Sequence, residues 1–214
     1  GPDLRAFRSP AQPGIGRRLA GDDPVDDRSA QDPAQRTERL RLRRWTDADR
    51  APLARIMADP EVMRYRFAPL SREQSDQFID ENEASFDADG RGLWAVERLE
   101  DGRLLGWAGL GYSDFGARFC PAVDVGWTLA RDVWGLGYAT EAGRVALDHA
   151  FGPLGLGEVV AHTTASNERS RAVMRRLGMR HDPADDFDGP WYPEGHPRRG
   201  FVLYRMTAAD WPRS

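Results

Sequence analysis

The sequence predicts an α/β protein of the α+β type, with a mixed central sheet that carries helices on both faces. Three observations support this fold class. The segments follow the order β-α-α-β-β-β-α-β-α-β, the middle strands are joined by hairpin turns, and the later strands are separated by helices. A hydrophobic share of 40% in 214 residues is enough for the core of one domain.

The first elements of the domain have local start signals. Leucine alternates with arginine over residues 40–42, which predicts an edge strand. Thr46 can cap a helix over residues 47–57. Ser71 and Gln74 form a capping box that opens a second helix, which ends near residue 86.

The later elements alternate between β-rich and amphipathic stretches. A four-residue turn at 100–103 favours a hairpin between its two flanking strands. A glycine at position 178 is a suitable stop for the last helix. Strands are predicted at 92–99, 104–112, 122–129, 158–164 and 200–206, and helices at 140–151 and 167–177.

Residues 1–36 differ from the rest in composition. They are rich in Pro, Gly, Asp and Arg and show no periodicity, which predicts a low-complexity arm that is disordered or extended. The folded domain is therefore expected over residues 37–214. An ordered arm would lie on a surface, and this arrangement would favour a homodimer.

Composition and cysteine content limit the function classes. The net charge of −4 argues against nucleic acid as the main partner, since such proteins usually carry a basic face. The single cysteine, Cys120, excludes an intrachain disulfide and a cysteine-based zinc site, and no metal is expected. No apolar run approaches 18 residues, so we expect no membrane partner and a cytoplasmic protein.

A glycine turn at residues 135–137 lies between a predicted strand and a predicted helix. Gly135 and Gly137 let the backbone approach a ligand closely. The first turn of the following helix offers unpaired N–H groups and the positive end of the helix dipole. This arrangement predicts a site for a phosphate or pyrophosphate.

The turn alone leaves several ligands open. A P-loop needs Gly-Lys-Ser/Thr, whereas Gly137 is followed by Tyr138 and Ala139, which argues against an ATPase. A dinucleotide fingerprint would need Gly or Ala where Thr140 stands, although Glu158 lies at the distance of a ribose-binding acid. A plain strand-to-helix turn without a ligand is the remaining alternative.

Two longer segments resemble a known family. Residues 125–142, which read VGWTLARDVWGLGYATEA, resemble the acyl-CoA-binding motif of the GNAT superfamily of N-acetyltransferases. Residues 167–179, NERSRAVMRRLGM, and the closing strand near residues 202–211 are similar to the branch of the ribosomal-protein alanine N-acetyltransferases (RimJ/RimL-like). The resemblance covers residues 37–211 and implies a mostly antiparallel GNAT sheet. One departure is Asp132, where many relatives carry Gln or Arg.

The resemblance implies that acetyl-CoA is the cosubstrate. The pyrophosphate would lie on backbone N–H groups of the glycine turn, the pantetheine arm would run beside the strand that ends at Leu129, and Asn167 would contact the arm or anchor its helix. Arg131 would meet a phosphate or remain a solvated turn arginine. The residues expected to bind the cosubstrate are Trp127, Leu129, Arg131, Trp134, Gly135, Leu136, Gly137, Tyr138, Ala139, Thr140, Asn167 and Arg171.

Two side chains are candidates for the chemistry of acetyl transfer. Asp124 shares one strand face with Gly126 and Thr128, opposite an apolar face, and falls where the superfamily often places a catalytic glutamate. We expect it to deprotonate the amine through water, because Asp is shorter than Glu. Ser170 is expected to hydrogen-bond the leaving thiolate, since Met174 occupies the position of the usual tyrosine. A structural Asp and a helix-surface Ser are the alternatives.

The remaining histidines and aromatic residues are expected either to pack in the core or to line the acceptor site. His149 and His162 are expected to be packing residues, and Trp45, Trp94 and Trp107 are expected to be core. The long acidic and aromatic loop at residues 181–196 is expected to line the acceptor site, with Glu194, Trp191 or Tyr192 contacting a cationic amine.

The sequence therefore predicts an N-acetyltransferase that moves an acetyl group from acetyl-CoA to a primary amine. The acceptor would be a protein N-terminus or a small molecule. Two alternatives remain open, a catalytically silent acyl-CoA-binding module and an acyltransferase that uses a longer acyl-CoA.

Overall fold

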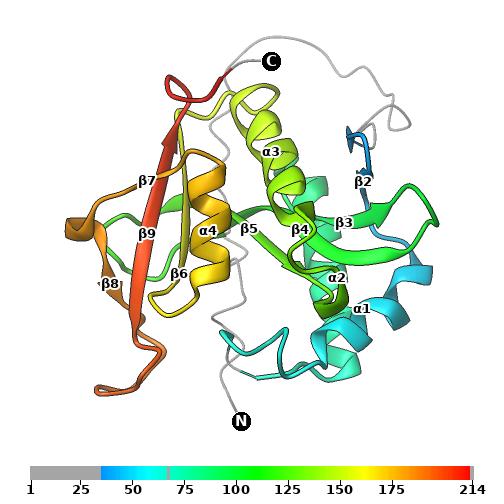
Figure 1. Cartoon of the computed structure of the whole chain (residues 1–214), viewed down its shortest axis with the longest axis horizontal. Helices are drawn as coiled ribbons and strands as arrows, with labels where there is room; N and C mark the ends of the chain where they lie inside the picture. The colour runs from blue at the N-terminus through cyan, green and yellow to red at the C-terminus, as the bar shows by residue number, and fades with distance from the viewer. Residues whose placement is uncertain (1–34, 67, 213–214) are drawn as a thin grey trace.

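The computed structural model describes residues 35–66 and 68–212, which form one sheet with helices on both of its faces (Figure 1). The strand order across the sheet is β1-β2-β3-β4-β5-β6-β9-β7, and β8 pairs with β9. Most of the predicted arm, residues 1–34, lies outside the described residues. The predicted mixed and mostly antiparallel α/β fold is confirmed.

The described residues form four α-helices and nine strands. The helices are α1 (Arg50–Met57), α2 (Arg72–Asp89), α3 (Tyr138–Phe151) and α4 (Glu168–Arg176). The strands are β1 (Gln35–Arg36), β2 (Leu40–Arg43), β3 (Leu93–Arg98), β4 (Leu104–Ser113), β5 (Ala122–Leu129), β6 (Glu158–Thr164), β7 (Arg180–His181), β8 (Phe187–Asp188) and β9 (Gly200–Thr207). The four strands β4, β5, β6 and β9 and the four helices frame the site described below.

The junction between β5 and β6 differs from the rest of the sheet. Every other pair of neighbouring strands is antiparallel, whereas β5 and β6 are parallel. They are in register at one position, Asp124 with Val160. Because β5 continues to Leu129 while paired only with β4, the two strands diverge and open a gap in the middle of the described sheet (Figure 1).

Helices cover the two faces of the sheet and close two apolar clusters. In the view of Figure 1, α3 and α4 lie in front of the strands and α2 lies behind them. The larger cluster packs α3 and α4 against the sheet and includes the fully buried Leu147 and Met174. The smaller cluster packs α1 and α2 against β3 and β4 and includes Leu53, Ile79 and Trp107.

Local sequence signals explain the helix starts. The Ser71 hydroxyl accepts a hydrogen bond from the Gln74 N–H, and the Gln74 side-chain oxygen accepts one from the Ser71 N–H. The predicted capping box of α2 is therefore formed. Thr46 forms an analogous box with Asp49, although the first turn after it is a 3₁₀ turn and α1 begins at Arg50. The helix α3 begins two residues earlier than expected, because Gly137 adopts a left-handed conformation at its N-cap.

Three short strands were not predicted, and they correct two expectations. Gln35 and Arg36 were assigned to the arm, but they pair with β2, so residues 40–43 are not an edge strand in the described sheet. The strands β7 and β8 lie within or beside the loop after α4 and pair with β9. A strand of two residues has no measurable alternation, so the sequence pattern cannot reveal it.

The tryptophans expected in the core are buried. Trp45, Trp94 and Trp107 are 6%, 1% and 2% exposed. Within residues 35–66 and 68–212, we find no helix with the length and apolar character needed to cross a membrane.

Candidate active site

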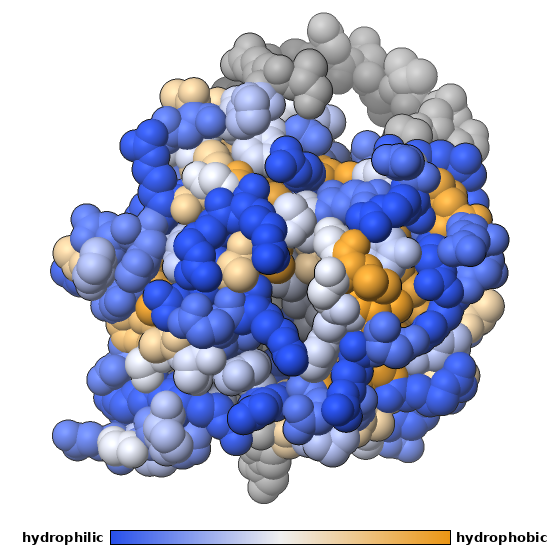
Figure 2. Space-filling model, viewed as in Figure 1, coloured by the Kyte–Doolittle hydropathy of each residue, from blue (hydrophilic) through white to orange (hydrophobic). Residues whose placement is uncertain are grey.

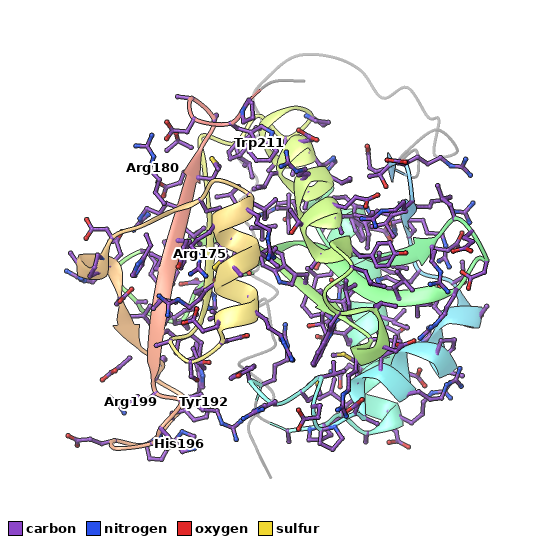
Figure 3. All side chains as sticks on the ribbon, in the orientation of Figure 1. Arg175, Arg180, Tyr192, His196, Arg199 and Trp211 are labelled. Atoms are coloured by element: carbon purple, nitrogen blue, oxygen red, sulfur yellow. The ribbon has the colours of Figure 1, made fainter. Side chains whose placement is uncertain are left out.

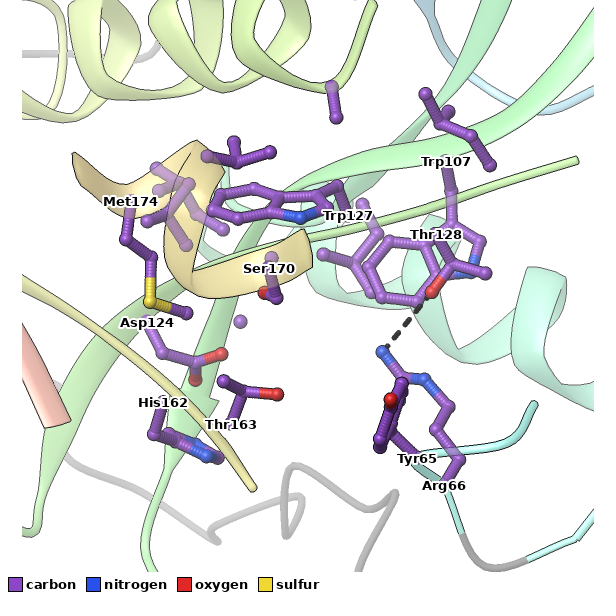
Figure 4. Close-up of a pocket in the computed structure, with 18 of the residues that line it drawn as sticks. Tyr65, Arg66, Trp107, Asp124, Trp127, Thr128, His162, Thr163, Ser170 and Met174 are labelled. Atoms are coloured by element: carbon purple, nitrogen blue, oxygen red, sulfur yellow. Dashed lines mark hydrogen bonds between the residues drawn. The ribbon is translucent and has the colours of Figure 1, made fainter. Parts of the chain in front are cut away.

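A cleft of about 2030 Å³ opens where β5 and β6 diverge (Figure 4). Its walls come from β5, the turn before α3, the first turns of α3 and α4, and the loops near residues 61–66 and 191–192. The cleft therefore joins the predicted phosphate turn to the carboxylate of Asp124. A long cosubstrate and a second molecule can meet in one space of this size.

The glycine turn has the geometry of an anion cradle. Gly135 and Gly137 have φ angles of +81° and +87°, a region that side chains with a Cβ rarely adopt. The first bond of the α3 ladder runs from the Glu141 N–H to the Gly137 carbonyl, at 3.1 Å. The N–H groups that precede Glu141 therefore have no partner within the helix and face the dipole-positive end. These residues fit a pyrophosphate group.

Two aromatic and cationic contacts fix the start of the turn. The Trp134 indole N–H donates to the Leu129 carbonyl at 2.9 Å, which joins the end of β5 to the turn. The Arg169 guanidinium lies over the Trp134 ring, 4.5 Å from its centroid. This stacking brings a cation from α4 to the wall beside the glycine turn.

A second tie holds the turn from the other side and was missed at the sequence level. The Glu141 carboxylate accepts from the Arg39 Nε at 2.8 Å and from the Thr37 hydroxyl at 2.5 Å. The same Arg39 donates from Nη1 to the Leu136 carbonyl at 3.0 Å and stacks on Tyr138. The loop before β2 is therefore bonded to the phosphate turn, although about a hundred residues separate them.

Most residues expected to bind the cosubstrate line the cleft. Arg131 and Arg171 do not, because Arg131 is exposed outside it and Arg171 donates to Ala165 and Glu168. The residues that line it are Trp127, Leu129, Trp134, Gly135, Leu136, Gly137, Tyr138, Ala139, Thr140 and Asn167. Binding by any of these residues stays a prediction.

Three other arginines on α3 and α4 line the cleft, namely Arg144, Arg169 and Arg176. Arg169 and Arg176 are seven residues apart on α4 and share a face, whereas Arg171 is about 200° around the helix from Arg169. Figure 2 shows that the surface over α4 is strongly hydrophilic. A helical wheel of α4 would therefore have indicated that Arg169 and Arg176, and not Arg171, share the face that lines the cleft.

The Asp124 carboxylate lines the cleft at the point where β5 and β6 are paired, in a space provided by a glycine of β4. Its Oδ1 accepts from the Ser113 hydroxyl at 3.0 Å. Gly111 is its register partner on β4, and a Cβ there would lie 3.1 Å from Oδ1 and 3.2 Å from Oδ2. The half-buried carboxylate is thus held by Ser113 against a bare stretch of backbone.

A guanidinium shares this face of the sheet with Asp124. Arg66 stacks on the Trp107 ring at 4.8 Å and donates to the Thr128 hydroxyl at 3.4 Å (Figure 4). Burial lowers the pKa of Arg66 to about 10, and the charge of Asp124 acts in the opposite direction, so Arg66 is cationic at neutral pH. The sequence pattern gave no signal for Arg66, since it lies in a loop outside the motifs.

Ser170 and Asn167 lie at the start of α4. The Asn167 side chain accepts from the Ser170 N–H at 3.3 Å and donates to the Thr163 hydroxyl at 2.9 Å. Asn167 is therefore the N-cap of α4, and this bond joins the helix to β6. Ser170 and Met174 line the cleft on the same side (Figure 4).

The loop at residues 181–196 contributes aromatic side chains to the cleft. Trp191 and Tyr192 line it, whereas the exposed Glu194 does not. Tyr192 and His196 stack at 4.4 Å, near the lower end of β9 in Figure 3. Within the described residues, no group of three or more His, Cys, Asp or Glu side chains is arranged to hold a metal ion.

Comparison with protein-family models assigns the greater part of the chain. Residues 39–180 match the model described as "Acetyltransferase (GNAT) domain". Among curated proteins, the chain is 30% identical over 190 residues to the FsC-acetyl coenzyme A-N(2)-transacetylase of Aspergillus fumigatus, covering 85% of this chain and 79% of that protein.

Solved structures give the same assignment. An acetyltransferase from Agrobacterium tumefaciens has a TM-score of 0.67 at 27% identity, covering 87% of this chain and 99% of the other. Mycobacterium smegmatis RimJ in complex with CoA-disulfide has a TM-score of 0.65 at 23% identity, covering 82% and 85%. The second likeness is one of fold.

Proposed function

This chain belongs to the GNAT family of acetyltransferases, and we propose that it transfers an acetyl group from acetyl-CoA directly to a primary amine. The observation that carries the proposal is the position of Asp124. Its carboxylate lines the same cleft as the cradle before α3, beside the one register point that joins β5 to β6. A thioester held from the cradle and an amine next to Asp124 would meet there.

The donor half of the proposal rests on the cradle and its arginines. The N–H groups before Glu141 would bind the pyrophosphate, and each such contact near a helix N-terminus contributes about 0.3–1 kcal/mol. Arg144, Arg169 and Arg176 would add positive charge at the same end. The backbone edge of β5 beyond Asp124 lacks a β6 partner within the described sheet, so the pantetheine amides would bond to it as an added strand.

On the acceptor half, Asp124 is proposed as the general base. A primary amine has a pKa of about 8–10, so at pH 7 it must lose a proton before it attacks. Asp124 would take that proton through a water molecule. The amine nitrogen then forms a bond to the thioester carbon and the C–S bond breaks. The nitrogen loses its second proton to the leaving thiolate, which gives the amide and the free thiol of CoA. Ser170, on the opposite wall, would donate a hydrogen bond to that thiolate.

The acceptor itself is proposed by class. Trp191 and Tyr192 place aromatic rings beside the acceptor half of the cleft, which suits a cationic or apolar amine carrier. Both a protein N-terminus and a small-molecule amine fit this description. The name of the Aspergillus relative, FsC-acetyl coenzyme A-N(2)-transacetylase, describes acetyl transfer to a nitrogen atom, which supports a nitrogen acceptor here.

Thiol release from acetyl-CoA across a panel of amines tests the proposal. Asp124→Asn is expected to lower kcat/KM at pH 7 by about 100-fold or more, with partial recovery toward pH 9 as the neutral amine becomes abundant. The matched control is Asp87→Asn, an exposed carboxylate on α2 that pairs with Arg44. Wild-type activity of Asp124→Asn at pH 7 would remove Asp124 as the base.

The same assay separates the alternative functions. Tight CoA binding in calorimetry with no thiol release on any amine would show a silent binding module. Faster turnover with succinyl-CoA than with acetyl-CoA would show an acyltransferase for longer donors. Activity with acetyl-CoA and an amine is the outcome that we expect.

A further inference from the structure

Side chains from three strands form a series of two hydrogen bonds that ends at Asp124. His162 on β6 lies with Nε2 at 3.2 Å from the Ser113 Oγ on β4. The Ser113 hydroxyl donates to the Asp124 Oδ1 on β5 at 3.0 Å. His162 and Asp124 both line the cleft, with the carboxylate above the imidazole in Figure 4. The sequence prediction treated His162 as a packing residue.

The hydrogen-bond chemistry of these groups fixes where the protons are. An ionised carboxylate can only accept, and a serine hydroxyl has one proton to donate. Since that proton is given to Asp124, Ser113 can only accept from His162. With the Asp124 carboxylate ionised, the imidazole then carries its proton on Nε2 and its Nδ1 is unprotonated.

The surroundings of His162 oppose its conversion to an imidazolium. Four phenylalanine rings lie 5.7–6.0 Å from it, those of Phe115, Phe119, Phe187 and Phe201. The Nδ1 atom is buried and has no hydrogen-bond partner among the described residues. A second proton on Nδ1 would therefore have no acceptor there.

Two charged groups act on His162 from neighbouring elements. Burial lowers the pKa of His162, the charge of Asp124 on β5 raises it, and the charge of Arg66 in the loop after α1 lowers it. The lowering causes prevail. The imidazole is neutral at physiological pH, so it acts as a fixed hydrogen-bond donor.

We propose that His162 is a positioning residue, which acts through Ser113 to hold the Asp124 carboxylate ionised and oriented for the amine. This inference rests on the proposed function, because it assigns His162 a role toward the proposed base. By donating from Nε2, His162 keeps the Ser113 proton directed at Oδ1 and leaves the second carboxylate oxygen for the acceptor or its relay water. A hydrogen bond to the charged form favours that form.

Two substitutions at position 162 separate donation from packing. His162→Phe keeps an aromatic ring among the four phenylalanines and removes the donor. His162→Gln keeps an amide donor near the position of Nε2. For His162→Phe, we expect the acid limb of the kcat/KM profile to move up by about one pH unit, which is about a tenfold loss on that limb. His162→Gln should stay within about threefold of wild type.

A control variant and a measurement on the wild-type protein distinguish the loss of the His162 donor from misfolding of a variant. His149→Gln changes the histidine of α3 that bonds the Gly90 carbonyl, outside the cleft, and should leave the profile unchanged. Histidine ¹⁵N chemical shifts of the wild-type protein report the tautomer directly. They should show His162 neutral and protonated on Nε2 at pH 7.5, and a proton on Nδ1 would overturn the proposal without any variant.

The kinetic outcomes separate this inference from the function on which it rests. A His162→Phe profile identical to wild type, or an equal loss at every pH, would overturn the positioning role, while an inactive Asp124→Asn would leave the proposed base intact. Wild-type activity of Asp124→Asn would remove the base and the role of His162 together. A shifted limb in His162→Phe, restored in His162→Gln, is the supporting result.

Discussion

A methyl group added at Gly111 should impair catalysis without destabilising the fold. In Gly111→Ala, the new Cβ would lie 3.1 Å from the Asp124 Oδ1 and 3.2 Å from Oδ2. Gly111 has no positive φ angle, so alanine is compatible with its backbone. The carboxylate must therefore retreat by about 0.3 Å to reach an ordinary contact distance.

This movement weakens the hydrogen bond between the Ser113 hydroxyl and the Asp124 carboxylate. Moving the carboxylate away from Gly111 strains the 3.0 Å contact with the Ser113 hydroxyl. A hydrogen bond to a charged group contributes about 1.5–3 kcal/mol, and losing roughly half of that is about 1 kcal/mol. We expect kcat/KM to fall about five- to tenfold. The melting temperature should stay constant or rise, because replacing glycine by alanine reduces the entropy of the unfolded chain.

The assay is thiol release for kcat/KM, with calorimetry for CoA affinity and thermal unfolding for stability. Gly157→Ala is the matched control, since nothing lies within 4 Å of a Cβ at that position. If Gly111→Ala kept the wild-type kcat/KM, the carboxylate would not need the space that Gly111 provides. A large drop in melting temperature would instead indicate disrupted packing, and either result would refute the reasoning.

Three further predictions concern the cradle, an ion pair and the helix interface. Gly137→Val should weaken CoA binding at least about tenfold in calorimetry, because a β-branched residue is strained at a φ of +87°; unchanged affinity would contradict the cradle. Asp49→Asn should destabilise the fold in urea by about 3 kcal/mol, because it leaves the half-buried Arg43 guanidinium short of a partner. Burial raises the pKa of Asp49, but the hydrogen bonds from Arg43 and Thr46 outweigh burial and hold that pKa below its ordinary value. The difference in free energy of unfolding between the wild type and Asp49→Asn should therefore be complete above about pH 4. It should vanish as the pH falls through the lowered pKa of Asp49 in the folded state. Gly143→Val should lower the free energy of unfolding by about 1–3 kcal/mol, because a Cβ at Gly143 would lie 2.9 Å from the Leu177 Cδ1, between α3 and α4. An unchanged unfolding midpoint would show that the two helices can move apart.

Elements with strong local signals could be predicted closely from the sequence. The strands β5 and β6 have the predicted bounds, because both alternate or run in β-branched residues between clear breaks. The helix α2 begins at its capping box, and α4 begins after Asn167. In each case the residues that decide the boundary are neighbours in the chain.

Features that depend on distant pairing could not be predicted in this way. The divergence of β5 from β6 follows from a register limited to Asp124 and Val160, and no local pattern encodes it. The tie between Arg39 and Glu141 likewise joins segments far apart in sequence. The turn composition predicted a phosphate site, but the bonds from Arg39 that hold this turn became visible only in the folded chain.

The candidate site shows the same division. Asp124 could be predicted from its strand face. Its hydrogen-bond partner Ser113 lies on β4, and His162, which bonds Ser113, lies on β6. His162 is packed among aromatic rings, as expected, and it also bonds Ser113, which the sequence did not predict. Arg171 was expected to bind the cosubstrate, but it donates to the Ala165 carbonyl and does not line the cleft.

The single register point between β5 and β6 has a consequence for how the protein responds to its ligand concentration. The two halves of the sheet are joined there by few backbone bonds, so a molecule that bridges both strand edges would complete the sheet as well as bind it. Such a ligand stabilises the folded chain by mass action, by about 2.7 kcal/mol at one hundred times its dissociation constant. If acyl-CoA is that ligand, the thermal stability of this protein would follow its supply.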